Sequence, residues 1–185
     1  MPRRILVLVF VLFGAPLLAA TLAGVTLPDT ITVGDRTLVL NGMGVRSKLF
    51  VKVYVGGLYL EQKSGDARAI IQAESVKRVV LHFIYGEVDR GRMVESFTEG
   101  FEGNLPDKGK SLKPQIDQFL GATETMKKDE ELVVTYVPGT GTTLTIRGKD
   151  KLTIPSQAFG QAVFSIWFGQ KPASDALKNG MLGRK

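Results

Sequence analysis

The sequence predicts a single α+β domain, an open-faced β-sandwich of mostly antiparallel strands with helices packed on one face. Two observations lead to this prediction. Short segments rich in β-branched and aromatic residues are joined by tight turns in the first and last parts of the chain, which is typical of antiparallel hairpins. Apolar residues at helical spacing gather mainly between and after these segments, so the helices can cover one side of one sheet. The chain contains no internal repeat and no linker long enough to divide it.

The amino terminus has the pattern of a cleavable signal peptide. Residues 1–4 are cationic, residues 5–13 form an uncharged apolar run, and a proline and small residues follow. An uncleaved membrane anchor is the alternative, but the unbroken apolar run is shorter than the ~20 residues that a membrane-spanning helix needs. We therefore expect cleavage after Ala20 or nearby, with residues 1–20 as the signal peptide and residues 21–185 as the domain. No later segment is long and apolar enough to span a bilayer.

Composition and charge restrict the compartment and the partners. The chain has no cysteine, so no disulfide can form and stability must come from packing. An export signal on a cysteine-free chain of this length favours the periplasm of a Gram-negative bacterium. The net charge of +6 falls by two when the arginines of the signal peptide leave, and the remaining basic residues are interspersed with acidic ones. No basic stripe with interleaved aromatics is present, so nucleic-acid binding is not expected. The sequence identifies no protein partner.

The first part of the domain predicts a hairpin followed by a long strand. The hairpin is expected over residues 26–40, where residues 30–33 and 37–40 flank a Gly-Asp turn. Residues 41–44 (Asn-Gly-Met-Gly) are expected to be a flexible link. A long strand follows over residues 49–61, in which Gly56-Gly57 indicates a bulge or a close approach by another element. The alternation of this strand predicts two faces. They comprise Leu49, Val51, Val53, Val55 and Tyr59 on one side, and Phe50, Lys52, Tyr54 and Leu58 on the other.

The remainder of the chain predicts helices and strands joined by polar turns. We expect helices over residues 65–74, 86–100, 111–126, 156–168 and 173–182, and strands over residues 76–85, 131–137 and 142–155. A tight turn at Gly148-Lys149 divides the last of these segments into two strands. Ser156 is expected to cap the fourth of these helices. The Gly139-Thr140-Gly141 sequence lies between two strands without a following Lys-Ser/Thr pair. It therefore predicts a hairpin turn rather than a phosphate-binding loop.

Few residues of this chain are suited to nucleophilic or metal-dependent chemistry. There is one histidine, His82, and no Gly-x-Ser-x-Gly elbow, and a zinc site usually needs several His or Cys ligands. His82 lies in a predicted strand, where we expect a partly buried side chain that is hydrogen-bonded to a neighbour. The carboxylate pairs Glu87/Asp89 and Glu99/Glu102 are expected on solvated helix faces, the first pair near a helix N-terminus. The sequence therefore predicts no metal site and no cofactor.

The most informative polar residues are Arg46, Lys52 and Tyr54. Arg46 enters the predicted strand that carries the other two, and we expect Lys52 and Tyr54 on the same face. Two cations and a phenol on one sheet face are costly to cover with helices unless an anion or water accompanies them. An arginine fork binds a carboxylate through two parallel hydrogen bonds, and a tyrosine hydroxyl adds a third donor. These residues therefore predict a pocket for an amphipathic acid. An exposed edge, where Arg46 and Lys52 simply face water, is the alternative.

Short segments along nearly the whole domain form a recognisable series. The first runs from residues 40–46 (LNGMGVR) into residues 50–60 (FVKVYVGGLYL). Further segments lie, in order, at residues 136–142, 154–155, 166–169 and 175–178. Together they resemble the chalcone isomerase family, and in particular its bacterial exported, chalcone isomerase-like branch. The resemblance implies the open-faced β-sandwich of that family, in agreement with the pattern of strands and helices.

The resemblance also implies candidate catalytic positions. In the plant enzyme, which closes a chalcone to a flavanone, an arginine holds the substrate and guides the attacking oxygen. Carried over by position, that arginine is Arg46, and Tyr54 stands where the enzyme has a threonine. The other polar site residues of the family fall near Asp89, Ser96 and Ile166. Since Arg46 alone is kept, chalcone cyclisation is not expected, and Arg46 would be the catalytic residue if any activity remained.

The non-catalytic plant relatives in this family bind fatty acids and pair the arginine with a tyrosine that holds the carboxylate. Arg46 and Tyr54 resemble that pair, and Lys52 is a further candidate for binding the ligand. Aromatic side chains would contact the aliphatic chain: Phe97, Phe101, Phe119 or Trp167. We therefore predict a non-catalytic periplasmic binding protein for a fatty acid or a similar amphipathic carboxylate. An isomerase or intramolecular lyase acting on a phenolic enone is one alternative, and a scaffold or partner-binding domain with a vestigial cleft is another.

Overall fold

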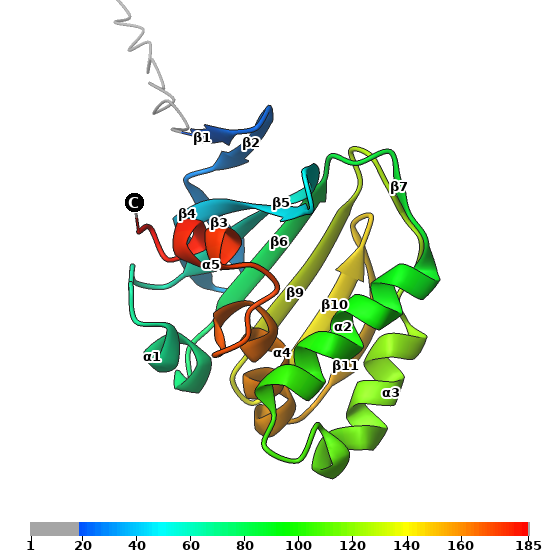
Figure 1. The fold of residues 1–185 in the computed structure, drawn as a ribbon. Coiled ribbons are helices and arrows are strands. Elements are labelled where there is room, and N and C mark those ends of the chain that lie inside the picture. Colours follow the sequence, from blue (N-terminus) through cyan, green and yellow to red (C-terminus); the bar gives the residue numbers. More distant parts are fainter. Residues whose placement is uncertain (1–18, 185) are drawn as a thin grey trace, which may run out of the picture.

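The computed structural model describes residues 19–184, and the first 18 residues of the predicted signal peptide lie outside them. A seven-stranded antiparallel sheet forms the framework, in the order β11-β10-β9-β6-β5-β4-β3 (Figure 1). Its strands are β3 (Thr30–Val33), β4 (Arg36–Lys48), β5 (Val51–Leu60), β6 (Lys77–Phe83), β9 (Glu131–Val137), β10 (Gly141–Ile146) and β11 (Lys149–Ile154). Two short ladders accompany it: β1 (Ala19–Leu22) with β2 (Val25–Pro28), and β7 (Glu87–Val88) with β8 (Met126–Lys127). The hairpin predicted over residues 26–40 is the β3–β4 pair from residue 30 onward, whereas residues 26–28 belong to β2 and pair with β1.

Five α-helices of the described residues lie on one side of this sheet (Figure 1). They are α1 (Ala67–Gln72), α2 (Arg90–Asn104), α3 (Lys113–Gly121), α4 (Gln157–Phe168) and α5 (Asp175–Met181), and a 3₁₀ turn, η1 (Lys110–Leu112), precedes α3. Their buried side chains form one continuous core with the sheet residues that face them. The opposite face of the sheet has a smaller core, to which β2 contributes Val25 and Leu27. The α+β class, with an antiparallel sheet and helices on one face, is therefore confirmed.

Side-chain caps determine where most of these helices begin. Four helices follow a side chain that accepts a backbone hydrogen bond from their first turn: Asp66 for α1, Asp89 for α2, Ser156 for α4 and Ser174 for α5. The predicted cap at Ser156 is thus confirmed. Asp89 places the start of α2 after β7 instead of at the predicted Gly86. The helix predicted over residues 111–126 is also too long, because Met126 already pairs in β8.

The structure corrects the predicted link over residues 41–44 and the strand expected after it. These four residues belong to β4, which continues to Lys48. A tight turn at Leu49 and Phe50 then reverses the chain into β5. Neither residue is usual in such a turn, which favours Gly, Asn and Asp. For that reason the prediction of one strand over residues 49–61 is wrong at its start.

Helix α5 explains the glycines of β4 and β5. A methyl group on Gly42 or Gly44 would collide with backbone atoms of α5, and one on Gly56 would collide with its side chains. Asn41, beside them, is buried, and its amide donates to the Met181 carbonyl oxygen at 2.8 Å. The glycines predicted to be flexible therefore mark a place where helix and strand backbones touch. The close approach predicted at the glycine pair of β5 is confirmed.

Four phenylalanines hold three helices against one another. The ring centroid of Phe119, on α3, lies 5.1 Å from that of Phe97 and 6.0 Å from that of Phe101, both on α2. The same ring lies 5.7 Å from Phe159 at the start of α4. Edge-to-face and tilted aromatic pairs are favourable at these separations. Helices α2, α3 and α4 therefore share one aromatic cluster.

A charged side chain is buried near the end of α1. Lys77 is 1% exposed, and its ammonium group also lies 5.1 Å from the centre of the Tyr136 ring. It donates to three carbonyl oxygens, those of Ile70, Ile71 and Ala73, at 2.8–3.0 Å. Lys77 thus satisfies groups that the end of the helix would otherwise leave unpaired. Its removal from water lowers the pKa of Lys77 to about 8.

We expect the protein to become more stable as the pH rises above 8. The pKa of Lys77 is about 8 in the folded protein and 10.5 in an unfolded chain. Between these two pH values the unfolded chain binds more protons, so the free energy of unfolding rises with pH, by at most about 3 kcal/mol. Above pH 10 the trend reverses, because burial raises the pKa of Tyr59 and Tyr136 to about 12 and the folded chain keeps protons that the unfolded chain releases. Urea denaturation between pH 8 and pH 10 measures the rise. Lys77→Met, although less stable, should lose it, and a rise that persists in this variant would contradict the role of Lys77.

Candidate functional site

A cavity of about 430 Å³ opens at one end of the sheet, between strands β4 to β6 and helix α2. The ends of the three strands provide one side: Arg46 and Lys48 of β4, Val51, Val53 and Tyr54 of β5, and Leu81, Phe83 and the following Tyr85 of β6. The helices provide the other side: Met93, Ser96 and Phe97 of α2, and Ile166 and Trp167 of α4. Most of these side chains are apolar. The cavity is therefore an apolar space into which a few polar groups project.

A bulge in β5 brings Tyr54 into this cavity. Tyr54 lies opposite Arg46 in the register of β4 and β5, whereas the next pair joins Ser47 to Lys52, so Val53 is the extra residue. A bulge interrupts the alternation of side chains between the two faces of a strand. Val53 and Tyr54 consequently both line the cavity. Arg46 was expected to enter the strand that carries Tyr54, but the two residues lie on different strands, and the β4–β5 turn brings together the pair that the family resemblance implied.

Lys52 lies on the other side of the same bulge. The prediction that it shares a face with Tyr54 is wrong, because the alternation on which it rested is broken at Val53. Lys52 is exposed and is not among the residues that line the cavity. Its contact with a ligand remains a prediction that the geometry of the cavity does not support.

Four side chains make a connected polar group in the cavity. Arg46 Nη1 donates to Ser96 Oγ at 2.7 Å, and the Arg46 Cζ lies 5.7 Å from the centre of the Tyr54 ring. The indole Nε1 of Trp167 donates to the Tyr54 hydroxyl oxygen at 3.4 Å. Because this hydroxyl accepts that bond, its own proton is available to another acceptor. Among residues 19–184, the bond to Ser96 is the one side-chain hydrogen bond that Arg46 makes, so the rest of its fork is also available.

No carboxylate of the described residues neutralises Arg46. Glu95 and Glu99 line the cavity, but neither forms an ion pair with it at 4.0 Å or less. Arg92, which also lines the cavity, is exposed and pairs with Asp89 at 3.2 Å. Arg46 is half-buried beside the buried Tyr54 ring, where water solvates a cation incompletely. The site therefore offers an unpaired guanidinium and two hydroxyl groups to an anion.

Three of the four predicted cleft residues line the cavity, namely Ser96, Phe97 and Ile166. The fourth, Asp89, does not, because its carboxylate caps α2 by accepting from the Arg92 N–H at 3.0 Å. Of the aromatic side chains predicted to contact an aliphatic chain, Trp167 lines the cavity together with Phe97. Phe101 and Phe119 lie in the helix core instead and do not line it.

Several lining residues were not predicted. Arg92 and Glu99 recur with Ser96 at helical spacing on one face of α2, so a helical projection through Ser96 would have found them. Lys48 and Tyr85 had no such signal. Lys48 precedes a turn that the sequence does not mark, and Tyr85 follows the end of a strand.

His82 and the Gly139-Thr140-Gly141 segment lie away from the cavity. His82 Nδ1 lies 3.1 Å from Glu131 Oε1, so the predicted hydrogen-bonded histidine is confirmed. Residues 138–140 connect β9 to β10, and Gly141 begins β10, which confirms the hairpin turn. Within residues 19–184, no group of three or more His, Asp or Glu side chains is placed to hold a metal ion. In the same range, no helix is long and apolar enough to cross a membrane.

A second, more open groove of about 900 Å³ lies between α1, α4 and the end of α2. Its cations are Arg68, which is exposed, and Lys178, whose ammonium group already donates to the Gly169 carbonyl oxygen at 2.6 Å. Phe168 is its one aromatic residue among the described side chains. The groove thus lacks the convergence of donors around an apolar space that distinguishes the first cavity.

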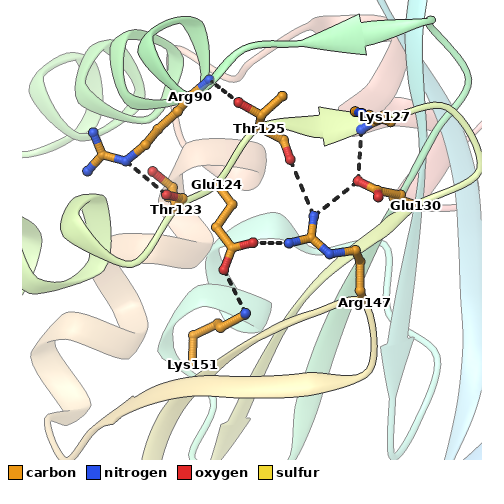
Figure 2. Close-up of polar contacts among 8 residues, drawn as sticks. All are labelled: Arg90, Thr123, Glu124, Thr125, Lys127, Glu130, Arg147 and Lys151. Carbon is orange, nitrogen blue, oxygen red and sulfur yellow. Dashed lines mark hydrogen bonds and ion pairs between the residues drawn. The ribbon is translucent and has the colours of Figure 1, made fainter.

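A polar network fixes the first turn of α2, and with it one wall of the cavity (Figure 2). Arg90 is the first residue of α2, and its Nε donates to the Thr123 carbonyl oxygen at 3.0 Å. Its backbone N–H donates to Thr125 Oγ1 at 3.1 Å. The segment that follows α3 is therefore tied to the beginning of α2.

The same segment is tied to the sheet by ion pairs (Figure 2). Arg147, in the β10–β11 turn, pairs with Glu124 and, at 3.1 Å, with Glu130. Lys151 of β11 pairs with Glu124 at 2.6 Å. Because these groups share partners, they act as a network rather than as isolated surface pairs. The position of α2 relative to the sheet thus depends on contacts outside the cavity.

Arg90→Ala is expected to lower the free energy of unfolding by about 1–3 kcal/mol, because it removes the donor to Thr123 and leaves carbonyl groups near the end of α3 unpaired. Arg92→Ala is a matched control on the same helix. Its exposed pair with Asp89 should contribute less than about 1 kcal/mol. Urea denaturation of both variants measures the difference. Equal losses would show that the network does not fix α2.

Comparisons with known proteins agree with this architecture. A family model described as chalcone isomerase-like matches residues 19–183. Among solved structures, the crystal structure of a fatty-acid binding protein of Arabidopsis thaliana is similar over 89% of this chain and 95% of that chain, with a TM-score of 0.69 and 16% sequence identity. A search among curated proteins finds no match. At this level of identity, the solved structure establishes a likeness of fold.

Proposed function

The chain belongs to the chalcone isomerase-like family, and from this premise we propose that it is a non-catalytic binding protein for a fatty acid or a similar amphipathic carboxylate. We further propose that it acts after export, in a periplasm. One observation carries the proposal: Arg46 and Tyr54 face an apolar cavity of about 430 Å³, and no described carboxylate pairs with Arg46. A partly buried cation without an acidic partner in the protein favours the binding of an anionic ligand.

The head group is assigned to the polar end of the cavity. A carboxylate has two oxygens that accept hydrogen bonds, and the Arg46 guanidinium presents parallel N–H groups that match them. The Tyr54 hydroxyl, oriented by the bond from Trp167, supplies a further donor. Ser96 holds the guanidinium from the opposite wall at 2.7 Å. Binding would therefore replace the water around both partners by charge-assisted hydrogen bonds.

The chain of the ligand is assigned to the apolar part. Phe83, Phe97, Ile166 and the ring face of Trp167 provide a lining without further charge. A volume of about 430 Å³ lies within the range of about 300–1,000 Å³ that small-molecule sites have. Each methylene group that leaves water for such a lining contributes about 0.8 kcal/mol. An acid with a long aliphatic chain thus fits the chemistry of both ends.

Binding is favoured over isomerisation by the placement of the positions that the family resemblance implied. Asp89 is committed to capping α2, and Ile166 has no polar atom in its side chain. Tyr54 is buried and fills space with its ring. The solved structure with the same fold, reported as a fatty-acid binding protein, supports the same choice.

A long-chain fatty acid is expected to bind, and its methyl ester to bind roughly tenfold or more weakly, because the ester loses charge-assisted hydrogen bonds that contribute about 1.5–3 kcal/mol. Tyr54→Phe should lower the affinity for the acid by a similar amount while keeping the ring and its contact with Phe83 at 5.4 Å. Calorimetric titration of the full domain with acid and ester measures both effects.

Other outcomes of this experiment favour the alternatives. Equal binding of acid and ester, or no binding of either, would contradict the proposal and favour a scaffold with a vestigial cleft. If wild type consumed a hydroxychalcone, measured as a loss of its absorbance, and Arg46→Ala did not, the result would instead favour an isomerase in which Arg46 orients the oxyanion.

A further inference from the structure

The turn between β4 and β5 projects apolar side chains into solvent. Leu49 is 90% exposed and Phe50 is 100% exposed. Val51 and Tyr85 are also exposed, and the Tyr85 backbone N–H donates to the Val53 carbonyl oxygen of β5 at 3.1 Å, which keeps this tyrosine beside the hairpin. Within residues 19–184, these four are the large apolar side chains that are exposed. Apolar exposure is therefore concentrated at one end of the molecule.

The backbone of this turn is unfavourable for the residues that it contains. Leu49 has a φ of +57°, a left-handed conformation that glycine and asparagine adopt readily and that strains a leucine. Neither Leu49 nor Phe50 packs against the core, because both side chains are almost fully exposed. The stability of the fold therefore does not explain why a strained turn carries two large apolar residues. A contact with something outside the chain explains both features.

Two lysines flank the apolar tip. Lys48 and Lys52 are exposed, and neither forms an ion pair with an acidic group of the described residues. A lysine side chain has a long apolar stem, so its ammonium group can stay at the level of lipid phosphates while the tip lies deeper. Tyr85 suits the same boundary, where aromatic rings with a polar end gather. Cations around an apolar tip are typical of segments that bind to membrane surfaces.

We propose that the finger formed by residues 48–52 inserts into the surface of a lipid bilayer that contains anionic phospholipids. Lys48 and Val51 of the finger, with the adjacent Tyr85, also line the cavity. Insertion of the tip therefore turns the mouth of the cavity toward the bilayer. A carboxylate with an aliphatic chain then passes between bilayer and cavity without crossing bulk water. This second step rests on the proposed function, whereas insertion of the finger does not.

Site-specific fluorescence tests the insertion directly, because the chain has no cysteine and a single one can be placed and labelled. Phe50→Cys carrying an environment-sensitive fluorophore should show a blue-shifted, stronger emission with vesicles of phosphatidylcholine containing about one quarter phosphatidylglycerol. Lys110→Cys is the matched control, since η1 lies in the α2–α3 connection at the opposite end of the molecule (Figure 1). Its emission should not change. An unchanged emission at position 50, or equal changes at both positions, would overturn the proposal.

Vesicle sedimentation of unlabelled protein tests the residue types. The double variant Leu49→Asn, Phe50→Ser should partition onto these vesicles roughly tenfold or more weakly than wild type, because two apolar side chains no longer leave water. Lys52→Glu should weaken partition roughly fivefold or more, whereas Lys110→Glu, with the same change in net charge, should not. Salt should weaken wild-type partition. If wild type stayed in solution, the proposal would be overturned, and a protein partner would be the better explanation of the exposed apolar tip.

The proposed function is measured separately in this experiment. Calorimetric titration of the double variant with a fatty acid in the absence of vesicles should match wild type, because Leu49 and Phe50 do not line the cavity. A thermal melt shows that the variant folds. Lost vesicle partition with retained fatty-acid binding supports the finger, and retained partition without fatty-acid binding contradicts only the proposed ligand.

Discussion

Arg46→Ala is expected to lower the affinity for a long-chain fatty acid by about 2–5 kcal/mol, because it leaves a partly desolvated carboxylate without its counter-ion. The free energy of unfolding should change little. Arg46 is half-buried, and among the described residues its side chain makes one hydrogen bond, to Ser96. Calorimetric titration measures the affinity, and urea denaturation followed by circular dichroism measures the stability.

Two further variants show whether a specific clamp or a general positive field holds the ligand. Arg46→Lys keeps the charge but loses the planar fork, so its affinity should lie between those of wild type and Arg46→Ala. Arg92→Ala removes another arginine that lines the same cavity, but this side chain is exposed and paired with Asp89. Its loss should cost less than about 1 kcal/mol. If Arg92→Ala weakened binding as much as Arg46→Ala, the carboxylate clamp would be refuted.

Phe119→Ala is expected to lower the free energy of unfolding by about 3–5 kcal/mol, a large part of the roughly 5–15 kcal/mol that a domain has. The ring is 1% exposed and contacts aromatic side chains of both neighbouring helices. Its removal leaves a cavity at the point where α2, α3 and α4 meet. Urea denaturation measures the loss.

Phe119→Leu is the control for this variant. A leucine fills most of the space that the ring leaves, so the loss of stability should be clearly smaller. Fatty-acid affinity of the folded Phe119→Ala protein should stay close to that of wild type, because Phe119 does not line the cavity. Equal losses of stability in the two variants would mean that aromatic contacts, rather than filled volume, hold the helices.

The fold class and most of the secondary-structure elements follow from residues that lie close together in the chain. Alternating residues around a turn fixed the β3–β4 hairpin, a glycine turn fixed the β9–β10 hairpin, and Ser156 fixed the start of α4. The close approach at Gly56-Gly57 could also be predicted, since glycine weakens a strand and is typical of places where it bulges or another element touches it. The pairing of Arg46 with Tyr54 was implied by the family resemblance instead, because two residues this far apart along one extended strand do not touch.

The register of β4 and β5, in contrast, depends on contacts between residues far apart in the chain. The turn at Leu49 and Phe50 has no turn residues, and the glycines at positions 42 and 44 resemble a flexible link until α5 is seen to pack on them. The bulge at Val53, which separates Lys52 from Tyr54, also depends on pairing with neighbouring strands. Alternation along one strand shows which side chains share a face only while the ladder is regular.

The assembly of the site likewise depends on residues far apart in the chain. Ser96 lies 50 residues from Arg46, and Trp167 lies 113 residues from Tyr54, yet each pair is joined by a hydrogen bond. Helical spacing in α2 and α4 indicates which side chains turn inward, but it does not say which strand they will meet. That choice is made when the helices pack on the sheet, because the core closes around all of them at once. The same packing leaves Leu49 and Phe50 outside the core, so their exposure could not be predicted from an apolar pattern that is typical of a buried strand.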